Sequence, residues 1–279
     1  MSHNILNRFL SRVWGRTGLN RSVVLATATA CALGFGVARR AQANDLPMVV
    51  EGQLPVALDG TAQDSFTFDG EVGTPVMLTL ISEDFDGMLV LLGPDGDVVR
   101  FNDDPFPTWY EPSALEVVTG SANFFDPGLY VHLPATGTYT VQALSFSGIG
   151  GDYELTVRPA TAYEGILHQA RALYNGAKPP EAIELVLTTV LELYDTAIAI
   201  EPTQPYAYAE RALVRLVRAN EVSRLQDDLD YLPFEDDQLR ALLLADFEQA
   251  VMLFEQTEQT YSGWYTYSLS MIDRLQAYE

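Results

Sequence analysis

The sequence predicts a multidomain all-β plus all-α chain, in which an antiparallel, jelly-roll-like β-sandwich is followed by antiparallel helical hairpins. Three observations lead to this fold class. Apolar and polar residues alternate from Met48 to Pro159, with turns at short intervals, as in strands with one buried face. After Pro159, Ala, Leu, Glu and Arg recur at helical spacing. The 279 residues also exceed the usual size of one domain.

The first 43 residues have the composition of a secretory signal peptide. Four arginines precede an apolar run, residues 22–38, and Ala41-Gln42-Ala43 forms a small-residue cleavage pattern. A retained anchor is the alternative, because this run is just long enough to reach across a bilayer. We predict cleavage, since Ala, Thr and Gly make a weak membrane span. The expected location is therefore periplasmic, thylakoid-luminal or extracellular, with no membrane span after cleavage.

The predicted mature chain is strongly acidic. The sequence has 16 basic and 38 acidic residues, and six of the basic ones precede Asp45, which leaves ten against 38 and a net charge of −28. Nucleic acid and anionic lipid are thus excluded as expected partners, because phosphate binding needs clustered Lys and Arg. Cations or basic protein surfaces suit the chain better. Cys31 lies in the apolar run, so the mature chain would carry no disulfide and no thiolate nucleophile.

The strands are predicted from period-two alternation. In TYTVQALS, residues 138–145, the side chains of Tyr139, Val141 and Ala143 face one side. The same pattern recurs in DYELTVR, residues 152–158, and further strands are predicted at 76–82, 88–92, 98–101 and 129–133. Strands this short and numerous favour a β-sandwich.

Five aspartates gather in residues 85–104, FDGMLVLLGPDGDVVRFNDD, which presents a choice between a metal site and acidic turns. A calcium loop of the EF-hand type needs oxygen ligands at positions 1, 3 and 5. Neither a register that starts at Asp84 nor one that starts at Asp95 supplies them. The residues between the two apolar runs, Gly93-Pro94-Asp95-Gly96-Asp97, predict a tight hairpin turn instead.

The predicted sandwich resembles a known family over residues 48–158. The matching landmarks are Gly52-Gln53-Leu54, Asp64-Ser65-Phe66-Thr67-Phe68, Phe85-Asp86, Pro94-Asp95-Gly96, Asn102-Asp103-Asp104, residues 133–139 (LPATGTY) and Gly151-Asp152-Tyr153-Glu154-Leu155. In this order they are similar to the bacterial pre-peptidase C-terminal domain. The resemblance implies a non-catalytic accessory module and permits calcium at Asp86, Asp103 or Asp104 without requiring it. The alternative is that these carboxylates accept hydrogen bonds from loop backbone N–H groups.

The chain departs from that family at residues 105–128, where an aromatic-rich segment replaces a shorter polar loop. Trp109 and Tyr110 make this segment a candidate recognition patch, because such side chains concentrate contact energy. The alternative is a hairpin that packs on the sandwich or on the helices.

The helical half is predicted to contain helices at 161–175, 181–200, 205–221, 237–256 and 260–277, separated by proline-containing breaks and by the acidic segment 227–237. Tyr194, Ala197 and Pro202 stand at offsets that resemble the tetratricopeptide repeat, and Phe247 and Ala250 repeat the first two roles. The acidic segment is then an insertion of about 19 residues in the usual 34-residue period. A generic helical bundle is the alternative.

The tetratricopeptide resemblance implies a protein-binding surface. Arg211, Arg215 and Arg218 fall on one helical face, and with Tyr206 we predict that they bind a peptide, through an acidic segment or a C-terminal carboxylate. The alternative is intramolecular: the arginines would neutralise nearby acids, namely Glu210, Glu221, Asp227 and Asp228.

Common catalytic motifs are missing from the sequence, including G-x-S-x-G, H-E-x-x-H and the phosphate-binding loop. His132 and His168 stand singly in a predicted strand and a predicted helix, as structural histidines do. The sequence does not exclude a hydrolase whose catalytic groups are Asp and Glu carboxylates alone. The sequence therefore predicts a signal peptide (1–43), a sandwich domain (44–159) and a helical domain (160–279), which together form an exported, non-enzymatic adaptor or assembly protein without a required cofactor. The alternative is a calcium-dependent carbohydrate- or surface-binding module.

Overall fold

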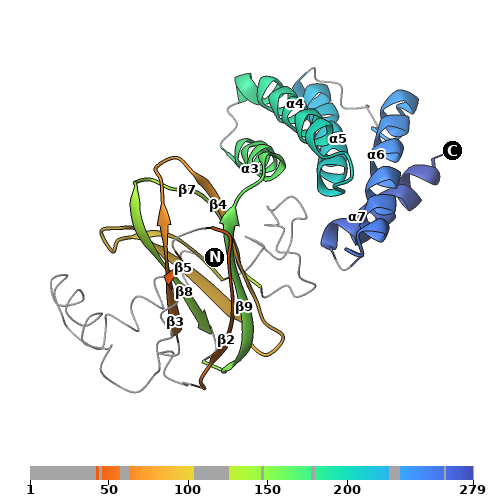
Figure 1. Cartoon of the computed structure of the whole chain (residues 1–279). Coiled ribbons are helices and arrows are strands. Elements are labelled where there is room, and N and C mark those ends of the chain that lie inside the picture. Colours follow the sequence, from red (N-terminus) through yellow and green to blue (C-terminus); the bar gives the residue numbers. More distant parts are fainter. Residues whose placement is uncertain are drawn as a thin grey trace, which may run out of the picture.

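The computed structural model describes residues 42–43, 46–56, 63–103, 126–145, 148–176, 180–225, 233–260 and 262–278. Strands fill the first part of this chain and helices the second, and the change falls between Pro159 and Ala162 (Figure 1). The fold class predicted from the sequence is confirmed: a β-sandwich precedes a helical domain. The predicted signal peptide lies outside the described residues except for Gln42 and Ala43.

The sandwich consists of two sheets. Their strands are β1 (Gln42–Ala43), β2 (Met48–Leu54), β3 (Gln63–Gly70), β4 (Pro75–Ile81), β5 (Gly87–Leu92), β6 (Val98–Asn102), β7 (Gly128–His132), β8 (Gly137–Ser145) and β9 (Gly151–Pro159). One sheet has the order β1-β3-β8-β5-β6 and the other β2-β9-β4-β7. All pairs are antiparallel except the short β1–β3 pair, in which Gln42 and Ala43 lie opposite Thr67 and Phe68.

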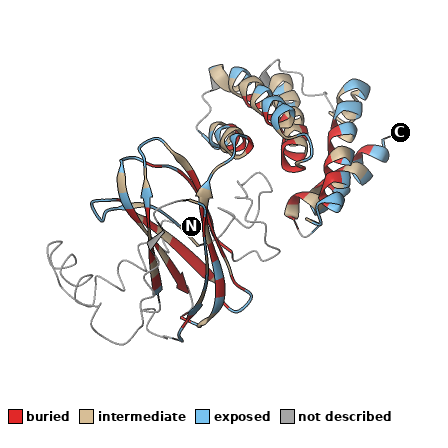
Figure 2. Ribbon diagram, in the orientation of Figure 1, coloured by how far each residue is buried: buried red, intermediate tan, exposed pale blue. Residues whose placement is uncertain are grey.

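The core of the sandwich follows the predicted alternation. Tyr139, Val141 and Ala143 of β8 are buried, and so are Leu155 and Val157 of β9 in the facing sheet. Figure 2 shows buried residues along the strands of both sheets. Burial of this apolar surface is the main free energy that holds the sheets together, since each fully buried large side chain contributes about 1.5–3 kcal/mol.

The hairpin turn predicted between β5 and β6 is confirmed. Gly96 N–H donates to the Gly93 carbonyl over 2.9 Å, and Gly93 N–H donates to the Asp97 carbonyl over 2.9 Å. The Asp95 carboxylate accepts from Asp97 N–H at 3.1 Å. Gly96 has a φ of 82°, a left-handed conformation that side chains disfavour. Asp95 and Gly96 therefore form a turn, as one of the two interpretations of the acidic stretch requires.

The second part of the chain consists of α3 (Ala162–Asn175), the short 3-10 helix η2 (Pro180–Ala182), α4 (Ile183–Ile200), α5 (Tyr206–Leu225), α6 (Asp237–Gln256) and α7 (Gly263–Gln276). All five predicted helices are present. Helix α5 continues to Leu225, whereas the sequence predicted an end at 221, because no Gly or Pro interrupts it and Arg224 pairs with Glu221 in its last turn.

The helices begin where the sequence supplies capping side chains. Thr161 and Glu164 form a reciprocal capping box at the start of α3, and Asp236 accepts from two backbone N–H groups at the start of α6. Ser262 caps α7 in the same way, through the N–H of Trp264. Each cap satisfies donors that the first helical turn leaves without partners.

Consecutive helices pack against each other as antiparallel pairs. Residues of α4 and α5 meet in reverse order, since Arg211 contacts Asp195 whereas Arg218 contacts Glu184. Helices α4 and α6 bury equivalent positions that lie 53 residues apart: Val190 and Leu243, Tyr194 and Phe247, and Ala197 and Ala250. This register agrees with the predicted internal repeat, although the identity of that repeat as a tetratricopeptide unit stays a prediction.

Candidate functional site

The three arginines predicted to bind a partner lie along α5, between α4 and α6. The Asp246 carboxylate of α6 accepts from Arg211 over 2.5 and 3.0 Å and from Arg215 over 2.5 Å. The side chain of Asp246 is 5% exposed. Burial opposes the charge on Arg211, but the hydrogen bonds and charges of Asp246 and Asp195 outweigh it and raise the Arg211 pKa. Two arginines are therefore fixed in place by one buried carboxylate.

The other acids that pair with these arginines are exposed. Arg211 Nη1 lies 2.6 Å from Asp195 Oδ1, and Arg218 Nη2 lies 3.1 Å from Glu184 Oε1. The side chains of Asp195 and Glu184 are 58% and 57% exposed. The arginines thus pair within the chain, as the alternative interpretation proposed, but mostly with other acids. Among the acids named from the sequence, Glu210 pairs with Arg171, Glu221 with Arg224, and Asp227 and Asp228 lie outside the described residues.

The pair between Arg171 of α3 and Glu210 of α5 is buried, and the Tyr194 hydroxyl of α4 donates to Glu210 over 2.9 Å. Burial acts against the charge on Arg171, but the charge of Glu210 beside it raises the Arg171 pKa. Burial and the same carboxylate raise the Tyr194 pKa, which keeps the hydroxyl protonated as a donor. These three side chains join three helices in one fixed arrangement.

The other predicted binding residues fall in different environments. Tyr206 is 2% exposed and packs edge-on against Phe254, with ring centroids 5.1 Å apart. Its ring fills the helical core and does not lie on the surface, because the first turn of α5 packs against the end of α6. Trp109 and Tyr110 lie outside the described residues.

The predicted calcium ligands do not form a cluster in the described part of the chain. Asp86 and Asp103 are partly exposed, and Asp104 lies outside the described residues. No group of three or more metal-ligating side chains occurs among the residues that the structure describes. Nearby, Asp84 Oδ2 accepts from the backbone N–H of Asp152 at 2.8 Å, which is the loop-stabilising role considered as the alternative for this region. Calcium binding stays a prediction.

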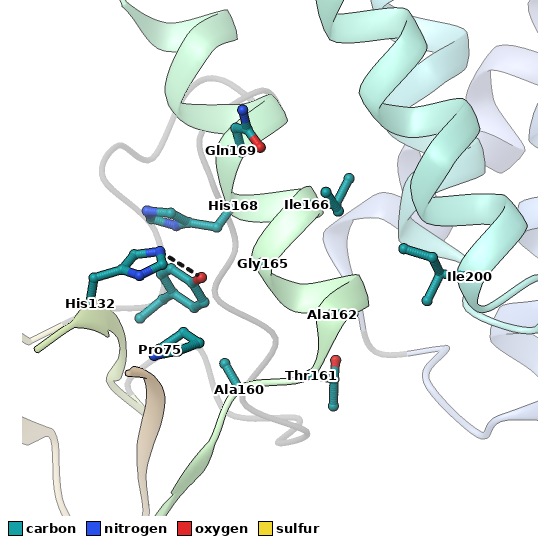
Figure 3. A pocket seen from close by; sticks show the side chains of 11 residues that line it. Pro75, His132, Ala160, Thr161, Ala162, Gly165, Ile166, His168, Gln169 and Ile200 are labelled. Carbon is teal, nitrogen blue, oxygen red and sulfur yellow. Dashed lines mark hydrogen bonds between the residues drawn. The ribbon is translucent and has the colours of Figure 1, made fainter. Parts of the chain in front are cut away.

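A pocket of about 570 Å³ lies where the sandwich meets the first helix (Figure 3). Its walls come from β4, β7, the connection after β9, α3 and the end of α4: they are Pro75, Tyr130, His132, Ala160, Thr161, Ala162, Gly165, Ile166, His168, Gln169 and Ile200. Most of these side chains are apolar, and the two histidines approach from opposite parts of the protein.

Tyr130 of β7 stands between the two histidines. Its ring stacks on His168 of α3, with centroids 4.3 Å apart and planes at 28°, and its hydroxyl lies 3.1 Å from His132 Nε2. His132 Nδ1 lies 3.4 Å from the Gly73 carbonyl. In the tautomer that carries its proton on Nδ1, the ring donates to this carbonyl and Nε2 accepts from the Tyr130 hydroxyl. Sequence reasoning treated the histidines separately. The available signal was the short connection at Ala160 and Thr161, which keeps α3 close to the sandwich.

An ion pair also joins the two parts at this junction. Arg158 of β9 donates to both oxygens of Glu164 in α3, over 2.8 and 2.5 Å. Burial alone would raise the Glu164 pKa, but the hydrogen bonds from Arg158 and from the Thr161 backbone lower it. Gly165 lets the helix approach closely, since a Cβ at that position would lie 3.2 Å from the Tyr130 hydroxyl.

Three known structures that resemble the chain each cover less than half of it. The pre-peptidase C-terminal domain of collagenase from Bacillus anthracis is 14% identical, covers 45% of this chain and 100% of its own, and has a TM-score of 0.31. PliG of Aeromonas hydrophila, a periplasmic inhibitor of g-type lysozyme, is 12% identical, covers 43% of this chain and 96% of its own, and has a TM-score of 0.31. CorA, a surface-associated copper-binding protein of Methylomicrobium album BG8, is 8% identical, covers 43% of this chain and 98% of its own, and has a TM-score of 0.31.

A pre-peptidase C-terminal domain is thus among the neighbours of the sandwich, in keeping with the resemblance seen in the sequence. At these identities and TM-scores the neighbours carry no functional argument for this chain, and the sandwich is assigned from its own strand pairing. No family model and no curated protein matches the chain. None of the described helices combines the length and the apolar character that a membrane span requires.

Proposed function

We propose that the protein is an exported, non-catalytic adaptor that binds a partner protein through its helices, with the sandwich as an accessory module. One observation carries the proposal. The arginine row of Arg211, Arg215 and Arg218 is matched by a single buried carboxylate, that of Asp246, whereas its other two counter-ions are exposed.

The exposed counter-ions are exchangeable at low cost. An exposed ion pair contributes about 0–1 kcal/mol, so displacement of Asp195 or Glu184 by a carboxylate of a partner costs little. Asp246 would stay in place during this exchange and hold Arg211 and Arg215 in the orientation found here. A preorganised guanidinium pair of this kind suits a short acidic segment or a C-terminal carboxylate.

The net charge of the mature chain restricts the partner further. A charge near −28 repels a uniformly acidic protein, although exposed charges farther apart than about 8 Å are largely screened at physiological salt. The partner that fits best therefore carries a short acidic segment on a surface that is otherwise neutral or basic. The N-terminal signal features support an exported compartment for this encounter.

Affinity capture from the exported fraction of the source cells tests the proposal with three variants. Arg215→Glu/Arg218→Glu should lose the partner, because it reverses the charge of the row. Asp195→Asn/Glu184→Gln should bind the partner roughly tenfold more tightly than the wild type. This variant removes two carboxylates that compete with the partner for the arginines, and a gain of about 1.4 kcal/mol corresponds to a tenfold change in affinity. Arg224→Glu is the control, since it reverses one charge on the same helix outside the row.

Opposite effects of the first two variants, with the control unchanged, would support the proposal. Equal capture by all variants would refute the role of the arginine row. Capture that appears only with calcium, and is lost on Asp103→Asn or Asp104→Asn, would favour the calcium-dependent surface-binding alternative instead.

A further inference from the structure

The junction between the sandwich and α3 brings together His132 and His168, the histidines that remain after residue 43. Both contact one aromatic side chain, Tyr130, and His168 does so through the face of its ring. We propose that the Tyr130–His168 contact is a pH-sensitive latch, which holds the helical part on the sandwich while His168 is neutral and releases it when His168 is protonated.

The latch is placed where it controls the relative position of the two parts. Only Ala160 and Thr161 connect β9 with α3, so a change at the start of α3 is transmitted to the helices that follow. The side-chain contacts described at the junction are the Tyr130–His168 stack and the Arg158–Glu164 ion pair. Among the described residues, the buried cluster of the sandwich and the buried clusters of the helical part have no residue in common. Loss of the Tyr130–His168 contact therefore weakens the junction without removing a residue from these clusters.

The charges around His168 disfavour its protonation while the parts are in contact. Arg171 lies one turn further along α3, and the charges of Arg100 on β6 and His132 on β7 also lower the His168 pKa. Glu164 also lies one turn away on α3, but its carboxylate is held by Arg158 of β9. A protonated His168 would gain a cation–π attraction to the Tyr130 ring, which favours protonation. Burial and the three basic groups disfavour the charge and outweigh this single contact.

The direction of the effect follows from linkage. Burial and these basic groups lower the pKa of His168 to about 4, whereas a solvated histidine titrates near 6.5. Protonation is thus easier in the separated state, and contact between the two parts weakens as the pH falls from about 6.5 toward 4. With Arg171 still nearby after separation, the expected change between pH 7 and pH 5 is on the order of tenfold in the docking equilibrium.

Fluorescence energy transfer within the full chain tests the latch. Dyes are attached at Val49→Cys and Leu185→Cys, two exposed positions on β2 and α4, in a Cys31→Ser background. The wild-type histidine should give a change in transfer efficiency as the pH is lowered from 7.5 to 4.5. His168→Phe keeps a neutral ring against Tyr130 and should stay docked throughout, whereas His168→Arg carries a permanent charge and should be separated at pH 7.5.

His132→Gln is the matched control, which should retain the pH response, and circular dichroism at each pH verifies that all variants stay folded. Titration of surface carboxylates is common to every variant, so the difference between the wild type and His168→Phe isolates the histidine. A transfer efficiency that does not change with pH, a response that survives in His168→Phe, or a docked His168→Arg chain at pH 7.5 would each overturn the proposal.

Discussion

Arg171 and Glu210 are separated by 39 residues in the chain and form a buried ion pair, in which Arg171 Nε donates to Glu210 Oε2 over 2.9 Å. The pair joins α3 to α5, and its side chains are 7% and 5% exposed. Replacement of one partner leaves a buried charge without its counter-charge, which costs about 3–5 kcal/mol.

We therefore expect Glu210→Gln to lower the free energy of unfolding by about 3 kcal/mol or more, measured by urea denaturation of the whole chain. Arg171→Met/Glu210→Leu provides the comparison, because it removes both charges and keeps apolar volume. It should be less destabilising than the single substitution. A single substitution milder than the double would show that solvent already reaches the pair.

Tyr194→Phe tests the third member of this network. The substitution removes the hydroxyl that donates to Glu210 over 2.9 Å and leaves the ring in the core. We expect a loss of about 1.5–3 kcal/mol, the usual contribution of one hydrogen bond to a charged group. Tyr208→Phe is a suitable control, since that hydroxyl is bonded at an exposed site to the Pro202 carbonyl. Equal effects of both substitutions would contradict a special role for the buried network.

Tyr153→Phe tests a polar contact within the sandwich. The Tyr153 hydroxyl donates over 2.5 Å to Asp64 Oδ2, and both residues are buried. Without this donor the Asp64 carboxylate loses a hydrogen bond that compensates its burial, so we expect a destabilisation of about 1–3 kcal/mol. Thermal unfolding followed by near-ultraviolet circular dichroism measures it. A second substitution, Asp64→Asn, should recover part of the loss, because it removes the charge that is costly to bury.

Global stability should fall on mild acidification because of His168. Burial and the neighbouring Arg171 and Arg100 lower its pKa to about 4 from the ordinary 6.5, so the unfolded chain binds this proton first. The stabilising contribution is complete above about pH 6.5 and is lost as the pH falls toward 4. After allowance for partial solvent contact, we expect about 1 kcal/mol less stability at pH 5 than at pH 7. Urea denaturation at both pH values should show a smaller difference in His168→Phe.

The helices and strands were predictable because their signals are local. The Thr161–Glu164 capping box, the Asp236 cap and the alternation around Tyr139 each lie within a few neighbouring residues. The positions of Val190 and Leu243 on equivalent faces also follow from helical spacing.

The contacts of the candidate sites were harder to predict. The counter-ions of the arginine row, Asp195, Glu184 and Asp246, come from the two helices that flank α5, so they depend on the register of antiparallel packing. Acids close in sequence, such as Glu210, were the natural expectation. The meeting of His132 and His168 depends on the direction in which α3 leaves β9, and no local pattern encodes that direction.

Gly165→Ala and Gly165→Leu test how closely α3 must approach the sandwich. Alanine should favour the helix by about 1 kcal/mol relative to glycine. Its Cβ would lie 3.2 Å from the Tyr130 hydroxyl, a contact that a shift of a few tenths of an ångström relieves, because the hydroxyl is the far end of a side chain. We expect Gly165→Ala to be neutral or slightly stabilising in urea denaturation. Leucine requires a larger displacement of Tyr130, so it should abolish the ring-current shifts of His168 in proton NMR spectra. An alanine variant that loses these shifts as fully as the leucine variant would show that Tyr130 has no freedom to move.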